Sequence, residues 1–205
     1  MILNIKLCFA ASVVFAACGA TSGIVFGDDT KTPNETERML FDFSDPVDIK
    51  PWYTVNDNVM GGISKGLVRA VDDSLVFYGS LSLENNGGFA SVRTKRMKLD
   101  LTDGDQLVVR YKGDGRRYYL SLYVPTLRIA YSFRTPLVTE KDKWQEASFP
   151  IDQFVATSFG RAIRGADPVV ASRVNAIGFM IADKREGPFK LEVAWMKVAG
   201  SESNE

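Results

Sequence analysis

The sequence predicts an all-β protein, a jelly-roll β-sandwich, from three observations. Apolar residues recur with a period of two from Met39 onward, which is the spacing of strands that bury one face. Gly, Asn, Asp and Pro residues separate these short runs. No run with a helical period of useful length appears, and residues 166–174 allow one helical turn at most. About nine or ten short strands joined by turns are typical of a sandwich or jelly roll.

Each predicted strand is an alternating run bounded by turn-forming residues. Asp72-Asp73 and Gly113-Asp114-Gly115 lie between paired runs and indicate two hairpin turns. Charged residues alternate with apolar ones, so we expect antiparallel sheets that cover one core and face solvent on the other side. The predicted strands are residues 39–43, 66–71, 74–79 continued by 81–83, 89–94, 106–111, 117–123, 128–133, 144–149, 176–181 and 189–196.

Two segments with paired glycines are predicted to be shaped loops rather than strands or helices. Val55–Ser64 contains Gly61-Gly62, and Asn85–Arg93 contains Gly87-Gly88. Glycine pairs permit positive φ and close backbone approach, and the neighbouring Asn and Asp residues bond their own main chain. We expect the two loops to meet at one rim of the sandwich. The predicted site lies where they meet Trp52, Arg93 and Asp114.

The composition limits the chemistry that this chain can perform. Its 205 residues are 45% hydrophobic and 24% charged, with 25 basic and 25 acidic residues, so no global field favours nucleic acid. Histidine is absent, which removes the commonest general base and excludes a Ser-His or Cys-His pair. Cys8 and Cys18 are the two cysteines, so a Cys nucleophile or zinc–thiolate site is excluded from Gly19 onward.

The first 27 residues are predicted to be a signal peptide or lipoprotein leader. Lys6 precedes an apolar run, and no acidic residue appears before Asp28. No Arg precedes Arg38, which does not fit a mitochondrial transit peptide. Residues 28–38 are polar and predict a flexible tether, residues 39–199 predict the jelly-roll domain, and residues 200–205 predict a disordered tail.

Three kinds of leader processing fit these residues. Phe15–Gly19 resembles a bacterial lipoprotein box with Cys18 as the lipidated residue, although Phe15 replaces the usual Leu, Val or Ile. Plain cleavage after Ala20 or Gly27 is the second possibility, and an uncleaved anchor over residues 7–26 is the third. Each of them exports the domain. We therefore expect a periplasmic or cell-envelope protein, held at the membrane by a lipid or an anchor.

The candidate site residues are polar or aromatic groups near the predicted loops. The acids and amides can bind a sugar or a calcium ion, or can simply form turns. The arginines can clamp a carboxylate or phosphate, or can form structural ion pairs, for example between Arg93 and Asp57 or Asp114. Trp52 can offer a platform for a sugar ring or pack in the core. The ligand-binding candidates are Trp52, Asp57, Asn58, Asn86, Arg93, Asp114 and Arg116.

The order of these motifs resembles the complex I intermediate-associated protein 30 family over about residues 41–198. The resemblance implies a galactose-binding-like jelly roll and supplies no catalytic residues. Its named mitochondrial members are non-catalytic assembly factors for NADH:ubiquinone oxidoreductase, which act on the matrix side. The residues that carry it are Trp52, Asn56–Ser64, Phe77–Arg93, Gly113–Tyr118, Trp144, Phe149-Pro150, Phe159–Arg161, Ile177–Met180, Gly187–Phe189 and Leu191-Glu192.

These observations lead to three hypotheses for function. The first is an exported, membrane-tethered domain that is not an enzyme, needs no cofactor and binds a protein partner, such as a subunit of a respiratory complex. The second is a carbohydrate-binding module of the cell envelope that binds a glycan. The third is a carboxylate-based hydrolase, which needs an acid and a base at a set separation. Its candidate acids are Asp57, Glu84, Asp114 and Glu192.

Overall fold

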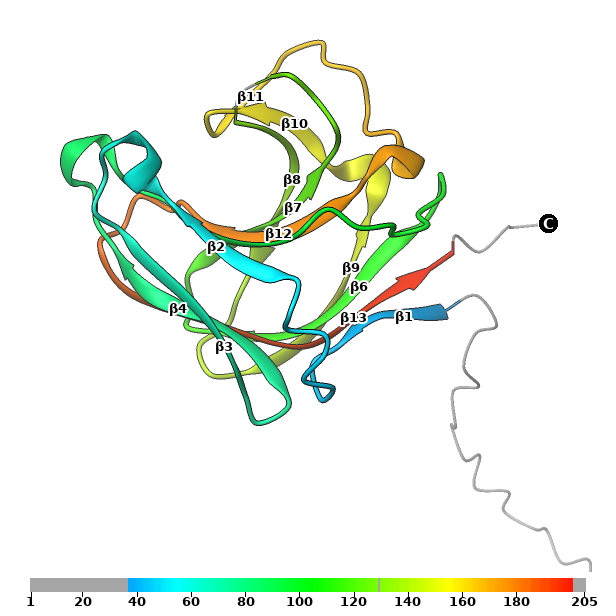
Figure 1. Ribbon diagram of the computed structural model, residues 1–205, viewed down its shortest axis with the longest axis horizontal. Coiled ribbons are helices and arrows are strands. Elements are labelled where there is room, and N and C mark those ends of the chain that lie inside the picture. The colour runs from blue at the N-terminus through cyan, green and yellow to red at the C-terminus, as the bar shows by residue number, and fades with distance from the viewer. Residues whose placement is uncertain (1–36, 129, 201–205) are drawn as a thin grey trace, which may run out of the picture. The chain divides into compact units, whose positions relative to one another are not determined.

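A computed structural model describes residues 37–128 and 130–200, which fold into two antiparallel β-sheets (Figure 1). The first sheet has six strands in the order β3-β4-β13-β6-β9, and β1 also pairs with β13. Strand β13 is long enough for β4 and β1 to follow one another along it: β4 pairs with residues 187–193 and β1 with residues 195–199. The six strands are β1 (Glu37–Asp42), β3 (Lys65–Val71), β4 (Ser74–Leu81), β6 (Gln106–Gly113), β9 (Trp144–Pro150) and β13 (Gly187–Ala199).

The second sheet has seven strands in the order β11-β10-β8-β7-β12-β5-β2. Four short 3-10 helices lie in the connections: η1 (Asp57–Met60), η2 (Glu84–Asn86), η3 (Ile151–Gln153) and η4 (Ala171–Arg173). The seven strands are β2 (Trp52–Asn56), β5 (Ala90–Thr94), β7 (Arg117–Tyr123), β8 (Tyr131–Val138), β10 (Val155–Ser158), β11 (Arg161–Ala162) and β12 (Ala176–Ile181).

The jelly-roll sandwich predicted from alternation is confirmed. Strands β7 and β12 have the predicted bounds, and β3 and β4 pair through the predicted hairpin. Asp72 and Asp73 take φ values of 46° and 55° in its two-residue turn. Such turns need positive φ at both central positions, which Asp tolerates better than most residues.

Three strands were not predicted. Strand β2 extends into the segment that we expected to be loop, because Val55 and Asn56 continue its pairing with β5. Strands β10 and β11 are short edge pieces without clear alternation. Tertiary pairing, rather than pattern, creates them. The predicted helical turn in residues 166–174 is limited to η4.

The core lies between the sheets and is rich in aromatic side chains. Trp52 is 6% exposed and stacks on Phe179 with ring centres 5.8 Å apart. Phe41 and Phe43 pack edge-on against the same indole at 5.2 and 5.7 Å. These contacts join β1 and the residue that follows it to β2 and β12 of the other sheet, so they hold the two layers together.

Most of the N-terminal and C-terminal predictions concern residues that the structure does not describe. The leader with Cys18, residues 28–36 of the tether and residues 201–205 of the tail lie outside the described residues. Strand β1 begins at Glu37, so the last two residues of the predicted tether belong to the sheet. Among residues 37–128 and 130–200, no helix has the length and apolar character needed to cross a bilayer.

Candidate functional site

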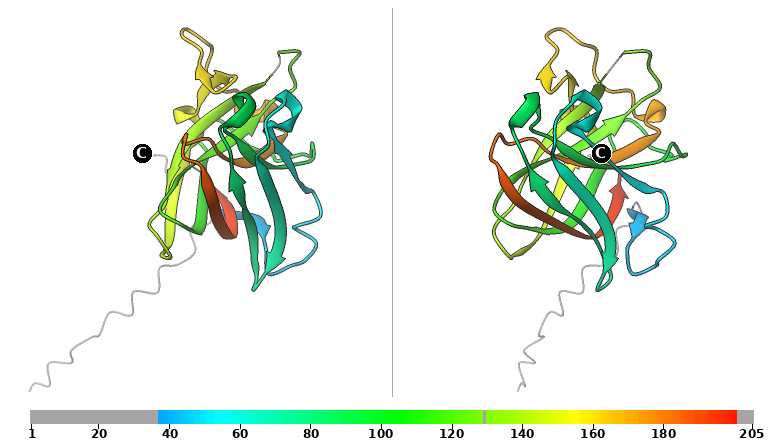
Figure 2. Two further views of the ribbon diagram at one scale, coloured as in Figure 1. Left: turned by 90° about the vertical axis from the view of Figure 1, so that its left-hand side faces the viewer. Right: turned by 60° about the vertical axis from the view of Figure 1, so that its left-hand side comes forward.

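The two glycine-pair loops meet at the carboxylate of Asp57, which is fully buried. Oδ1 accepts a hydrogen bond from the Ser64 backbone N–H at 2.9 Å, and Oδ2 accepts one from the Ser64 hydroxyl at 2.5 Å. Oδ2 also accepts from the backbone N–H groups of Gly88 at 2.7 Å and Phe89 at 3.3 Å. One side chain therefore ties the η1 loop to the η2 loop. Figures 1 and 2 show the two helical turns next to each other at one end of the sandwich.

One glycine of each pair, Gly62 or Gly87, makes room for this carboxylate. A Cβ on Gly62 would lie 2.4 Å from Cγ of Asp57, and a Cβ on Gly87 would lie 2.7 Å from its Oδ2. Neither distance is possible for a real side chain without movement of the loop. Gly62 and Gly87 are thus explained by a buried acid, and their partners Gly61 and Gly88 have positive φ values of 91° and 123°.

Hydrogen bonding keeps Asp57 ionised. Burial alone would raise its pKa, but the hydrogen bonds from Ser64, Gly88 and Phe89 outweigh burial and hold the pKa below its ordinary value. Ser64 continues the network, since its hydroxyl also contacts the carbonyl oxygen and the N–H of Ser82. Asp57 is therefore a structural anion with its oxygens occupied.

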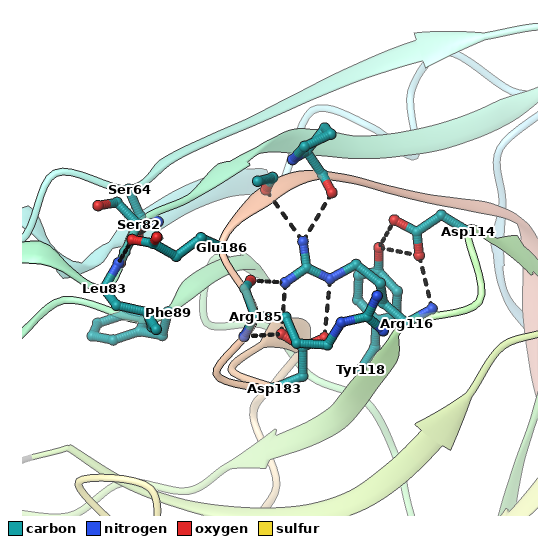
Figure 3. A network of polar contacts seen from close by, with 12 residues as sticks. Ser64, Ser82, Leu83, Phe89, Asp114, Arg116, Tyr118, Asp183, Arg185 and Glu186 are labelled. Carbon is teal, nitrogen blue, oxygen red and sulfur yellow. Dashed lines mark hydrogen bonds and ion pairs between the residues drawn. The ribbon is translucent and has the colours of Figure 1, made fainter.

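Arg116 forms a second buried network, shown in Figure 3. Its Nε and one Nη donate to the two oxygens of Asp183 at 3.0 and 2.6 Å, and both side chains are less than a tenth exposed. The guanidinium also donates to the carbonyl oxygens of Arg185, Gly187 and Pro188. The hydrogen bond with Asp183 raises the pKa of Arg116. Arg116 therefore fixes the connection between β12 and β13 and has no donor left for a ligand.

Asp114 belongs to the same region, and its carboxylate is also engaged in hydrogen bonds within the protein. Its carboxylate accepts from the Tyr118 hydroxyl at 3.1 Å, the Lys190 N–H at 2.9 Å and the Arg116 N–H at 3.1 Å. Burial, followed by the charge of Asp114, raises the pKa of Tyr118 far above its ordinary range. Tyr118 is therefore a neutral donor to Asp114, and the Asp114 carboxylate links the β6–β7 turn to β13 through the Lys190 N–H.

The structure does not bring Trp52, Arg93 and Asp114 together at the rim. Trp52 lies in the core, so the exposed platform expected at this residue is not present. Arg93 reaches neither Asp57 nor Asp114: its Nε donates to the Ser91 hydroxyl at 3.1 Å, and its guanidinium lies 4.8 Å from the ring centre of Tyr123. The closeness of Arg93 to the glycine-pair loop in the sequence did not predict its contacts. Arg93 is on the outer face of a strand whose alternate residues enter the core.

The remaining candidates, Asn58 and Asn86, are exposed on the two loops. Asn86 has a φ of 59°, so its role in the loop is that of a turn former. Around them the loop end carries four exposed apolar side chains, which we call the apolar tip: Val59, Met60, Ile63 and Leu83, with exposed fractions of 70%, 52%, 48% and 41%.

Of the carboxylates proposed for hydrolysis, Asp57 and Asp114 accept the hydrogen bonds described above. Glu84 is exposed, whereas Glu192 is bound by Lys112 at 3.0 Å and Lys190 at 2.7 Å. Burial would raise the pKa of Glu192, but hydrogen bonds from the two lysines hold it below the ordinary value. Within the described part of the chain, no three Asp, Glu, Cys or His side chains gather as a metal site would require.

The outer face of the seven-stranded sheet combines Arg93 with residues that the sequence analysis did not select. Cross-strand pairing aligns Arg93 of β5, Gly178 of β12, Ser121 of β7 and Arg134 of β8 in one row. Their neighbours in sequence, Val92, Phe179, Leu120 and Phe133, fill the core, so this row points away from it. Tyr53, Tyr119 and Tyr123 flank the row on the same face. The alternation in residues 117–123 predicted that one side of this strand faces away from the core. It did not predict which residues of other strands lie beside it.

Comparison with known proteins places this fold in a family. The model of the family described as "Complex I intermediate-associated protein 30 (CIA30)" matches residues 41–193. A mitochondrial complex I intermediate-associated protein 30 of Mus musculus is 24% identical over 80% of this chain and 56% of its own length. The corresponding protein of Drosophila melanogaster is 27% identical over 80% of this chain and 63% of its own length. This chain thus spans less than two thirds of either relative.

Solved structures with the same fold include carbohydrate-binding modules. The family 11 module of a cellulosomal cellulase of Clostridium thermocellum superposes with a TM-score of 0.63 at 14% identity, covering 82% of this chain and 98% of the module. A family 30 carbohydrate-binding module gives a TM-score of 0.52 at 13% identity, covering 82% and 90%. At such identities the likeness establishes the fold alone.

The names of the curated relatives correct one prediction. The relatives of mouse and fly are named as mitochondrial proteins, which contradicts the exported, cell-envelope location expected from the leader. That expectation depended on a short apolar segment after Lys6 and on the lack of arginine before Arg38. An apolar N-terminus without arginine was therefore a poor guide to the compartment.

Proposed function

Because this chain belongs to the complex I intermediate-associated protein 30 family, we propose that it is a non-catalytic binding domain that takes part in assembling respiratory complex I. The observation that carries the proposal is the family match, which runs from β1 to β13 and so includes both sheets. The partner would be a protein subunit or intermediate of that complex. The activity itself would be binding, without chemical turnover.

The state of the acidic residues supports a non-catalytic role. Asp57, Asp183 and Glu192 all have a pKa below the ordinary value, because hydrogen bonds to their ionised forms outweigh burial. A general acid needs a raised pKa to hold its proton at neutral pH. These carboxylates are held in the opposite state, and the chain contains no histidine to replace them.

The apolar tip supports contact with a protein. Its side chains lie on two loops that Asp57 fixes together, so they present a preformed apolar surface rather than a mobile one. Apolar residues on a rigid support lose little conformational entropy on binding, and clustered exposed apolar side chains are typical of interaction sites. We therefore assign the partner contact to this end of the sandwich.

Co-purification tests the proposal. The full-length chain, with a C-terminal affinity tag, is expressed in its source cells and isolated after mild detergent extraction. Complex I subunits are expected among the proteins enriched over an untagged control, as measured by quantitative mass spectrometry. Met60→Ser is expected to lower this enrichment at least about threefold, because it removes apolar area from the tip.

Leu67→Ser is the matched control. Leu67 on β3 has the same 52% exposure as Met60 but lies outside the tip, so its substitution should leave the enrichment unchanged. Absence of every complex I subunit from the wild-type eluate would refute the assembly role. Equal loss in both variants would refute the assignment to the tip.

Carbohydrate binding is a second candidate, favoured by Tyr53, Tyr119 and Tyr123 on the outer face of the seven-stranded sheet. Tyrosine rings on a sheet face can stack on sugar rings, so a glycan is the class of ligand that this face would bind.

Affinity electrophoresis of the full chain in gels that contain a mixed-linked β-glucan tests this candidate. Retarded migration that disappears in Tyr119→Ala is expected if it holds, because the substitution removes a stacking ring. Tyr78→Ala on β4 of the opposite sheet serves as the control. Migration identical to that in a gel without glycan would eliminate carbohydrate binding for this polymer.

A further inference from the structure

The seven-stranded sheet has a charge pattern that the rest of the molecule does not share. Its strands contain four arginines and not one aspartate or glutamate. The six-stranded sheet, in contrast, carries four acids, Glu37, Asp42, Glu146 and Glu192. Positive charge without acidic neighbours on one sheet provides an electrostatic preference for an anion on that side.

Arg93 and Arg134 are the two arginines that face each other across the middle of this sheet. Strands β12 and β7 lie between theirs, which separates the two Cα atoms by about 14 Å, or three strand spacings. The intervening positions in the row are Gly178 and Ser121, the first without a side chain and the second with a short one. Space is thus left for both guanidinium groups to converge above β12 and β7.

The side chain of Arg93 extends across β12 toward β7. A Cβ built on Gly178 would be 3.2 Å from Cγ of Arg93, so the arginine side chain lies across the glycine. Its guanidinium then stacks on Tyr123 of β7, two strands from its own. On the other side, burial lowers the pKa of Arg134, and the nearby positive charge of Arg93 acts in the same direction.

Both arginines are held by the same kind of hydrogen bond, from Nε to a serine hydroxyl. Arg93 donates from Nε to the Ser91 hydroxyl at 3.1 Å, and Arg134 donates from Nε to the Ser132 hydroxyl at 2.9 Å. Each serine lies two residues before its arginine. In the described part of the chain neither arginine has a carboxylate partner, and the Nη groups of both make no hydrogen bond. The donors that normally clamp an oxyanion are therefore oriented but unused.

Two buried hydroxyl groups belong to the same part of the sheet. Ser121 Oγ and Tyr123 Oη are buried within the described residues and have no hydrogen-bond partner. A buried polar atom without a partner is uncommon and costs about 1–3 kcal/mol, so it calls for an explanation such as a bound group. Ser121 occupies the row between the two arginines, and Tyr123 lies under the guanidinium of Arg93.

We propose that Arg93, Arg134, Ser121 and Tyr123 form a binding site for a phosphoryl group on the outer face of the seven-stranded sheet. Two guanidinium charges with no neighbouring carboxylate match the charge of a phosphate dianion better than that of a single carboxylate. The two free hydroxyls supply further donors to its oxygens. Tyr53 and Tyr119 border the site and would contact the organic part of a phosphate monoester.

Titration of the full chain with inorganic phosphate tests this site, followed through the arginine Nε–H signals in NMR spectra. The pH is kept above the second pKa of phosphate, and sodium chloride holds the ionic strength constant. Saturable shifts of the Arg93 and Arg134 signals are expected. Arg134→Gln should weaken binding at least about tenfold, because one charge-assisted pair of hydrogen bonds is lost.

Two further variants separate binding from folding. Ser121→Ala removes a hydroxyl without any partner, so the fold should be unaffected and phosphate affinity should fall about threefold. Arg69→Gln on β3 of the other sheet removes the same charge at a distance and should not change affinity. No saturable shift, or equal affinity in wild type, Arg134→Gln and Ser121→Ala, would overturn the proposal.

A parallel titration with glycerol 3-phosphate distinguishes the source of the phosphoryl group. Tighter binding than that of inorganic phosphate would identify a phosphate monoester as the ligand class, and equal binding would identify free phosphate. Acetate is expected to bind more weakly than either, and tighter binding of acetate would contradict the preference for a dianion. These experiments need no partner protein, so their outcome is independent of the assembly role.

Discussion

Asp57→Asn is expected to lower the free energy of unfolding by about 3 kcal/mol. The carboxylate accepts four hydrogen bonds, one from the Ser64 hydroxyl and three from backbone N–H groups of two loops. An amide has one oxygen, and its NH₂ group would face donors that it cannot accept from. Asp103→Asn is the matched control, since Asp103 is exposed and its substitution should change stability by less than about 0.5 kcal/mol.

The effect of Asp57 should depend on pH in a defined direction. Its pKa in the folded protein is below the ordinary value of 3.8. A group with a lowered folded pKa contributes its full stability above the unfolded pKa, and this contribution is lost as the pH falls through the folded value. The difference between wild type and Asp57→Asn should therefore be constant near neutral pH and shrink in acid. Urea denaturation at several pH values measures it, and a difference that grows in acid would contradict this assignment.

Loss of the Arg116–Asp183 pair is expected to be at least as costly. Arg116→Met should reduce the free energy of unfolding by about 3–5 kcal/mol, because it leaves the buried Asp183 charge and three carbonyl oxygens without their donor. Arg116→Lys should restore little, since an ammonium cannot reproduce the planar pair of bonds to Asp183.

The next residue provides an unusually close control for Arg116. Arg117 is exposed at the start of β7, so Arg117→Met is expected to change stability by less than about 0.5 kcal/mol. Thermal and urea denaturation of the three variants distinguish the buried pair from a general effect of charge. Similar stability of Arg116→Met and Arg117→Met would show that the pair is not important.

The loops illustrate what sequence pattern can and cannot predict about the site. Paired glycines next to Asn and Asp identified two loops, and the two loops do meet. Which acid they enclose depends on long-range contacts, because Asp57 accepts hydrogen bonds from Gly88 and Phe89, which are 31 and 32 positions away in the sequence. A one-dimensional pattern does not distinguish a buried acid from one that faces a ligand.

The arginines also show that sequence context does not distinguish a structural residue from a candidate site residue. Arg93 and Arg116 were both candidates, but Arg116 is enclosed by backbone carbonyls, whereas Arg93 lies on the open face beside Arg134. Arg134 was not a candidate, because nothing near it in sequence is unusual. Its significance arises only when strand order places β8 two strands from β12 and three from β5.

The sequence by itself determined the class of fold, the lack of histidine chemistry and the presence of the two glycine-pair loops. Period-two alternation and turn residues are local properties of the sequence, so they do not depend on the order of the strands in the sheets. The tertiary structure alone decided that Trp52 is core, that Asp57 and Arg116 are structural, and that four residues from four strands share one row on the outer face of a sheet. These outcomes depend on sheet order and register, which bring distant residues together through pairing that local pattern does not encode.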